Sequence, residues 1–66
     1  MSPEKMVMMA NQIATFFDSQ PGNAPDKIAD HLRDFWEPRM RAQLLTFMEA
    51  GGKGLLPSAE EAARRL

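Results

Sequence analysis

The chain has 66 residues, with eight basic and nine acidic side chains and no cysteine. This length allows one domain at most, and the lack of cysteine excludes disulfides, thiolate metal sites and iron–sulfur ligation. The balanced charge argues against a sequence-independent nucleic-acid binder, and no apolar run approaches the ~18 residues of a membrane span. Because so short a chain buries a modest share of its surface, association with another chain is the favoured source of additional stability.

The first predicted helix covers residues 3–19. Ser2 is its expected N-cap, and Pro3 suits the first helical position. Apolar residues recur at three- and four-residue spacing and form one stripe, which consists of Met6, Met9, Ala10, Ile13, Phe16 and Phe17. Met8 lies off this stripe, so we regard it as a candidate contact residue.

The second predicted helix covers residues 24–36, with Asn23 as its N-cap. Its apolar stripe consists of Ile28, Leu32, Phe35 and Trp36. Another side carries an acidic ridge, defined as Asp26, Asp30 and Asp34, which recur every four residues. We expect this ridge to be a solvent-exposed surface.

Two further helices are predicted at residues 38–50 and 58–65. The first of them carries Met40, Leu44, Phe47 and Met48 at helical spacing and ends at the pair Gly51-Gly52. Either Ser58 as N-cap or Pro57 at the first helical position fits the start of the last helix. The sequence therefore predicts one all-α domain over residues 1–66, a small three-helix bundle with a short fourth C-terminal helix.

The segment Phe35–Arg41, F-W-E-P-R-M-R, places the only tryptophan and two arginines at a predicted corner between helices. Trp36 is equally consistent with core packing and with partner contact. Arg39 and Arg41 are either solvated charges or forks that bind carboxylates on another protein. The methionines on the apolar stripes are expected to pack in the core.

Reactive groups are scarce. His31 is the only histidine and lacks a second histidine or a cysteine with which to bind a metal, so we interpret it as a solvated or interfacial side chain. Ser2, Ser19 and Ser58 occupy capping or turn positions without a nearby base. We expect no catalytic, cofactor-binding or metal-binding residue in this chain and no enzymatic activity of its own.

Three segments carry a family resemblance. M-A-N-Q-I-A-T-F-F (residues 9–17), F-W-E-P-R-M-R (residues 35–41) and A-G-G-K-G-L (residues 50–55) resemble the delta subunit of NAD-dependent, molybdenum-containing formate dehydrogenases. The resemblance implies an accessory subunit of a cytoplasmic complex that oxidises formate and reduces NAD⁺. It also implies that the large catalytic subunits, and not this chain, carry molybdopterin guanine dinucleotide, iron–sulfur clusters and FMN.

The first motif contains two polar residues, Asn11 and Gln12, in the middle of the predicted helix. We expect that folding does not require either of them. We therefore predict a partner-binding set that consists of Met8, Asn11, Gln12, Trp36, Arg39 and Arg41. Trp36→Ala, or Arg39→Ala with Arg41→Ala, is expected to release the subunit without unfolding it. No contact with nucleic acid or membrane is expected.

Three alternatives stay open. One is a maturation factor that meets the immature enzyme transiently, for example during cofactor insertion. Another is a self-associating helical protein with an unrelated regulatory role, which forms a homodimer when isolated. A DNA-binding helical hairpin is the least supported, because the third helix is apolar or neutral between Arg41 and Glu49.

Overall fold

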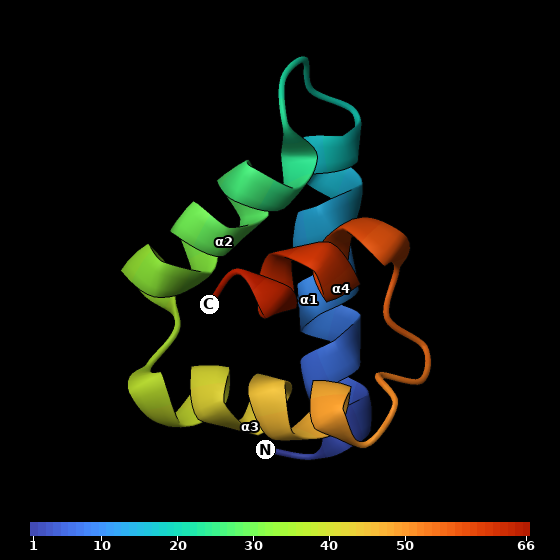
Figure 1. Cartoon of the computed structure of the whole chain (residues 1–66), viewed down its shortest axis with the longest axis vertical. Helices are drawn as coiled ribbons and strands as arrows, with labels where there is room; N and C mark the ends of the chain where they lie inside the picture. The colour runs from blue at the N-terminus through green and yellow to red at the C-terminus, as the bar shows by residue number, and fades with distance from the viewer.

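Four α-helices make up the regular structure of the chain, and the computed structural model describes all residues, 1–66 (Figure 1). In chain order they are α1 (Pro3–Asp18), α2 (Ala24–Phe35), α3 (Pro38–Glu49) and α4 (Pro57–Arg64). The structure contains no strand, so the prediction of an all-α fold is confirmed.

The helix starts follow from local capping. The Ser2 hydroxyl accepts a hydrogen bond from the Lys5 backbone N–H at the start of α1, and the Asn23 side chain accepts one from the Asp26 N–H at the start of α2. Each predicted helix extends one residue past the observed end. The fourth helix begins with Pro57 at its first position, so Ser58 is not its N-cap.

The end of α3 depends on two glycines. The Gly52 N–H donates to the Phe47 carbonyl and the Gly51 N–H to the Met48 carbonyl, which is the bonding pattern of a Schellman motif. Gly51 and Gly52 have φ angles of 117° and 62°, values that favour glycine. This motif reverses the chain into the loop that leads to α4.

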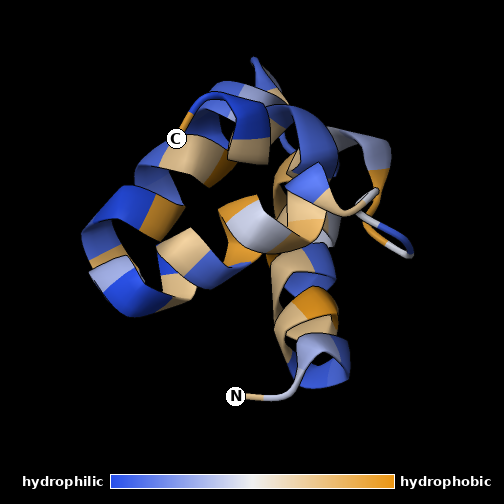
Figure 2. Ribbon diagram, turned by 60° about the horizontal axis from the view of Figure 1, so that its bottom comes forward, coloured by the Kyte–Doolittle hydropathy of each residue, from blue (hydrophilic) through white to orange (hydrophobic).

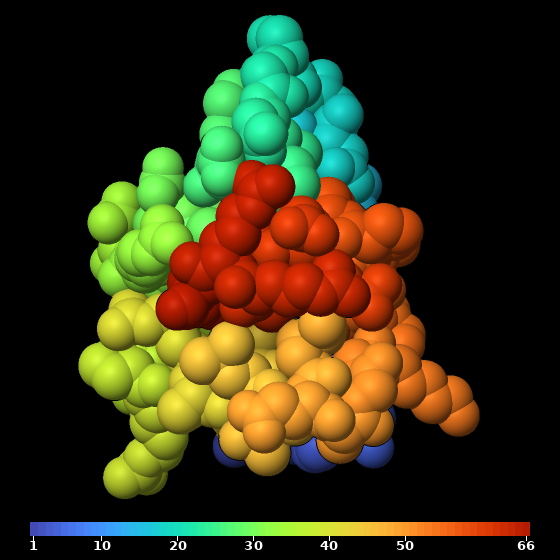
Figure 3. All heavy atoms as spheres, viewed as in Figure 1, coloured from blue at the N-terminus to red at the C-terminus, as the bar shows by residue number.

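Figure 1 shows how the helices are arranged. α1 and α2 lie close together at the turn that joins them, and α2 then slants away from α1 toward its own C-terminal end. α3 runs across the other end of α1, and α4 packs against each of the other three helices. In Figure 3, α4 fills the middle of the displayed face, bordered by α2 and α3. The short fourth helix is therefore central to the packing.

The core is built mainly from small side chains. It consists of Met6, Ala10, Ala14, Ile28, Ala29, Leu32, Trp36, Leu44, Leu55, Ala59, Ala62 and Ala63. Six of these twelve residues are alanine, so the helices approach one another closely and few large side chains fill the centre. Figure 2 shows hydrophobic and hydrophilic segments along each helix, as expected of amphipathic helices.

Polar contacts hold both ends of α4. At its start, the Ser58 hydroxyl donates to the Asp18 carboxylate at the end of α1, over 2.9 Å. At its end, Arg65 forms an ion pair with Asp26 on α2, and an Arg33 guanidinium N–H donates to the Arg65 carbonyl over 2.6 Å. These contacts fix α4 between the two helices that form the candidate site.

Candidate functional site

Four aromatic rings form a row across α1 and α2. Phe16 and Phe17 come from the last turns of α1, and their ring centroids lie 5.1 Å apart in an edge-to-face arrangement. Phe17 contacts His31 of α2 at 5.9 Å between ring centroids, and His31 contacts Phe35 at 4.7 Å. Such distances are typical of favourable aromatic pairs, so the row is a continuous surface.

The two ends of this row are exposed. Phe16 is 59% exposed and Phe35 is 73% exposed, although both lie on the apolar stripes of their helices. A place on the stripe does not lead to burial here, for two physical reasons. Two consecutive helical residues point about 100° apart, so Phe16 and Phe17 cannot both face one narrow core. Phe35 lies where α2 has slanted away from α1 (Figure 1).

A hollow lies beside the row. It has a volume of about 280 Å³ and is lined by Gln12, Ile13, Phe16, Phe17 and His31. A second hollow, with a volume of about 410 Å³, lies along α1 and is lined by Met8, Asn11, Gln12 and Thr15. We use the name aromatic face for the surface formed by Met8, Gln12, Ile13, Phe16, Phe17, His31 and Phe35.

The aromatic face includes two of the six predicted partner-binding residues. Met8 is 52% exposed, which agrees with its predicted position off the apolar stripe. Gln12 is exposed, and its side chain makes no hydrogen bond within the chain. Large exposed apolar surfaces of this kind often mark protein contacts.

Trp36 lies elsewhere. Its side chain belongs to the core and is only 7% exposed. It occupies the C-cap of α2, where the backbone has become extended (φ −88°, ψ 137°), so the indole leaves the direction that helical periodicity would give it. The prediction that Trp36 can be truncated without loss of folding therefore does not agree with its position.

Arg41 has a structural role that the sequence did not reveal. Its guanidinium donates to the backbone carbonyls of Arg33 and Trp36, each over 2.9 Å, and so closes the C-terminal end of α2. Arg39, two residues earlier, is exposed and makes no hydrogen bond or ion pair. Of the two, only Arg39 has its guanidinium free for another molecule.

This difference gives a testable prediction. Arg41→Ala leaves two carbonyl groups without their charged donor, and we expect a loss of about 1–2 kcal/mol in the free energy of unfolding. Arg39→Ala, the matched control, should change it by less than about 0.5 kcal/mol. Urea unfolding followed by circular dichroism measures both. Equal stability of the two variants would contradict the capping role of Arg41.

Asn11 also acts within the chain. Its amide nitrogen donates to the Gly54 carbonyl over 2.8 Å, and its amide oxygen accepts from the Leu56 N–H over 2.9 Å. The side chain thus holds the loop before α4 against α1. These contacts do not agree with the premise that folding has no need of Asn11. No local sequence signal could identify this role, since the partner groups lie 43 and 45 residues away.

Asn11→Ala and Gln12→Ala form a matched pair of neighbouring substitutions. Asn11→Ala removes both loop contacts, and we expect a loss of about 1–2 kcal/mol, or about 4–16 °C in melting temperature for a domain of this size. Gln12→Ala should melt within about 2 °C of the wild type. Differential scanning calorimetry tests the pair, and an unchanged melting temperature for Asn11→Ala would show that the loop does not depend on this amide.

The acidic ridge is partly neutralised by the fold. Asp26 pairs with Arg65, and Asp30 pairs with Arg33 at 2.9 Å. Asp34 takes part in no ion pair. The prediction of an exposed ridge is confirmed, because all three carboxylates belong to exposed residues.

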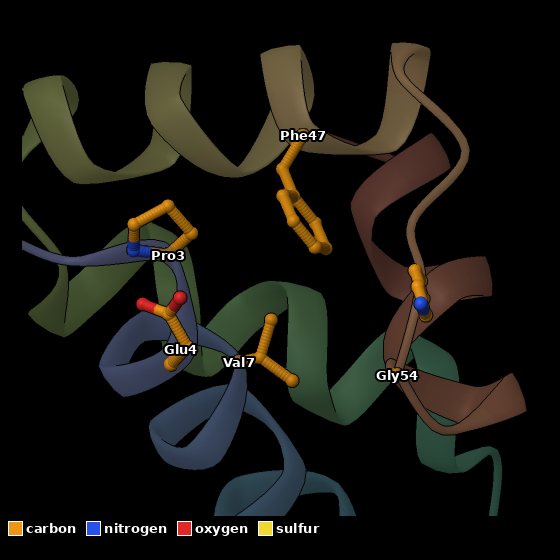
Figure 4. Close-up of a pocket in the computed structure, with 6 residues that line it drawn as sticks. Pro3, Glu4, Val7, Phe47 and Gly54 are labelled. Atoms are coloured by element: carbon orange, nitrogen blue, oxygen red, sulfur yellow. The ribbon is translucent and has the colours of Figure 1, made fainter.

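Another hollow lies at the opposite end of α1. It has a volume of about 510 Å³ and is lined by Pro3, Glu4, Val7, Phe47, Lys53 and Gly54. Figure 4 shows Phe47 of α3 and Val7 of α1 pointing toward each other across it. Glu4 and Lys53, the two charged residues that line it, are both exposed. The hollow shares no residue with the aromatic face.

Side chains able to bind a metal do not gather anywhere in the chain: no three histidine, aspartate or glutamate residues form a cluster that could hold an ion. None of the four helices combines the length and the apolar character needed to cross a membrane. Apart from the two hollows on or near its aromatic face and the one at the end of α1, the surface has no other cavity.

Comparison with known proteins identifies the family. The sequence pattern of the family described as NADH-dependent formate dehydrogenase delta subunit FdsD matches residues 5–63. Searches of curated proteins and of solved structures gave no match. The matched range contains α2 and α3 completely. It omits only Pro3 and Glu4 at the start of α1 and Arg64 at the end of α4. The chain therefore belongs to the family of NADH-dependent formate dehydrogenase delta subunits.

Proposed function

We propose that this chain is a non-catalytic accessory subunit of a cytoplasmic NAD-dependent formate dehydrogenase, which docks on the large catalytic subunits and aids their assembly or stability. The family membership supports a place in such an enzyme. The observation that carries the docking role is the aromatic face, on which Phe16 and Phe35 expose most of their side chains.

Exposure of these aromatic rings to water costs free energy, which binding of a partner recovers. Aromatic side chains have large apolar areas. Burial of apolar surface contributes about 25 cal/mol of favourable free energy per Å², and an exposed ring does not gain this contribution. A chain of 66 residues with so few large core side chains gains stability when a partner covers these rings. Docking through this face thus stabilises the small subunit as well as the contact.

The redox groups of the enzyme belong to other subunits in this proposal. Molybdopterin guanine dinucleotide, iron–sulfur clusters and FMN would sit in the large subunits. This chain has no cysteine to ligate a cluster and no group of side chains that fits a metal. Its contribution is the apolar and charged surface that it presents.

The test is purification of the enzyme from cells with and without this chain. We expect the chain to remain in stoichiometric amount with the complex that reduces NAD⁺ with formate, and we expect the complex lacking it to lose activity faster at raised temperature. A chain found only with immature, cofactor-free enzyme would instead indicate a maturation factor. A chain that never accompanies the enzyme would refute the proposal.

A further inference from the structure

We infer that the aromatic face binds an apolar segment of a partner polypeptide that carries lysine or arginine along its flank. The inference rests on the proposed docking function and adds the chemistry of the occupant. It depends on three observations: the charges beside the face, the internal use of the nearby cations, and the shape of the hollow.

Carboxylates line the α2 side of the aromatic face. Asp34 is exposed and lies three residues after His31, so the two side chains are neighbours on the helix surface. Asp30 directly precedes His31, and its side chain is 74% exposed even though it pairs with Arg33. Asp34, which takes part in no ion pair, therefore places an uncompensated carboxylate beside His31 at the α2 edge of the face.

The nearby cations are already held by groups of this chain. The Lys27 ammonium donates to the Pro21 carbonyl and lies beside Gly22, so its charge is held at the turn before α2. Arg33 bonds to the Arg65 carbonyl and to Asp30, and Arg41 bonds to two carbonyls at the end of α2. These contacts leave Asp34 without a cation from its own chain and Asp30 with one. A partner that supplies lysine or arginine here complements the exposed charge.

The hollow sets the apolar part of the occupant. Its volume of about 280 Å³ accommodates one large side chain between Phe16, Phe17 and His31. Phe35, which is 73% exposed, projects beyond the hollow and can insert between side chains of the partner. In protein interfaces, large apolar side chains of both partners commonly pack against each other at the centre, and polar or charged groups surround them.

A second copy of this chain fits less well. The arginines of α2 and of the adjoining corner, except Arg39, are held by internal partners, and a symmetric contact brings identical surfaces together. Two aromatic faces would bring Asp30 and Asp34 of both copies to one interface. A different polypeptide that is basic at this contact avoids that repulsion.

The experiment measures association of the labelled chain with formate dehydrogenase purified from cells that lack it. Stopped-flow traces at about 50 and about 300 mM KCl give the association rate constant, because screening weakens charge attraction at the higher salt. The double variant Asp30→Asn, Asp34→Asn removes the acidic rim. The matched control Glu4→Gln, Glu49→Gln removes two exposed carboxylates outside the aromatic face.

We expect the rim variant to associate about three- to tenfold more slowly at low salt and to lose most of its salt dependence, with the dissociation rate changed less than about twofold. The control should associate within about twofold of the wild type. An unchanged or faster association of the rim variant overturns the inference of a basic partner.

The same experiment separates this inference from the proposed function. If Phe16→Ala with Phe35→Ala weakens binding while the rim variant does not, docking through the aromatic face stands and the basic partner is rejected. If the wild-type chain does not bind the enzyme at either salt concentration, both are rejected. If light scattering shows a tight homodimer that the double phenylalanine variant dissociates, the occupant is a second copy, and the inference is also rejected.

Discussion

Trp36→Ala is expected to leave this protein with little or no net stability at room temperature. The indole is 93% buried, since its exposed fraction is 7%, and truncation of a buried tryptophan to alanine typically costs about 3–5 kcal/mol. Domains have a total stability of about 5–15 kcal/mol, and a 66-residue chain whose core contains six alanines lies near the low end. The loss should therefore be comparable to the whole stability.

The neighbouring residue supplies the control. Phe35→Ala removes another large aromatic side chain one position earlier, but this ring is 73% exposed. We expect Phe35→Ala to retain the helical circular dichroism signal and to shift the melting temperature by less than about 5 °C. A Trp36→Ala variant that melts like the wild type would place the indole outside the core in solution and restore its role as a partner contact.

Phe16→Ala combined with Phe35→Ala is expected to produce the largest change in assembly. Truncation of a buried aromatic anchor at an interface typically costs at least about 2 kcal/mol of binding free energy. Even one such anchor corresponds to about a 30-fold rise in the dissociation constant. Binding of the labelled chain to enzyme that lacks this subunit, followed by fluorescence anisotropy, measures the effect.

Two observations control this result. The double variant should keep its helical signal and its melting temperature within a few degrees, because both rings are more exposed than buried. Phe16→Leu with Phe35→Leu retains apolar area and should recover part of the lost affinity. A double alanine variant that binds as tightly as the wild type would show that the enzyme contacts another surface.

The helices and their starting points could be predicted because their causes are local. Ser2, Asn23 and Pro38 determine where three helices begin through caps and proline geometry within a few residues. The predicted ends extend one residue too far because the capping residues were counted as helical. Family membership could also be predicted, since it depends on motifs within the sequence.

The candidate site could be predicted only in part, because exposure depends on how the helices cross. Periodicity gives the direction of a side chain, but not whether another helix covers it at that point. Phe35 shares a stripe with buried Ile28 and Leu32, yet it is the last residue of α2, and this end of α2 slants away from α1 (Figure 1). Met8 could be placed correctly because it points away from the apolar stripe of α1, and its side chain is 52% exposed.

The internal roles of Asn11 and Arg41 could not be predicted from local sequence. Each side chain bonds to backbone groups that become its neighbours only after the chain has folded. The sequence does carry one signal of close packing, because Ala59, Ala62 and Ala63 recur at a spacing that forms a stripe of small residues on α4. That stripe indicates a helix packed closely among others.

The position of α4 also determines when the protein can fold. Ribosomes synthesise α4 after the other three helices, and its alanines complete the core against all of them. Until translation has passed Ala63, the apolar sides of α1, α2 and α3 lack their shared packing partner, and isolated helices of this length are marginal in water. The core of this unit therefore cannot be completed until α4, the last of the four helices in chain order, has been synthesised.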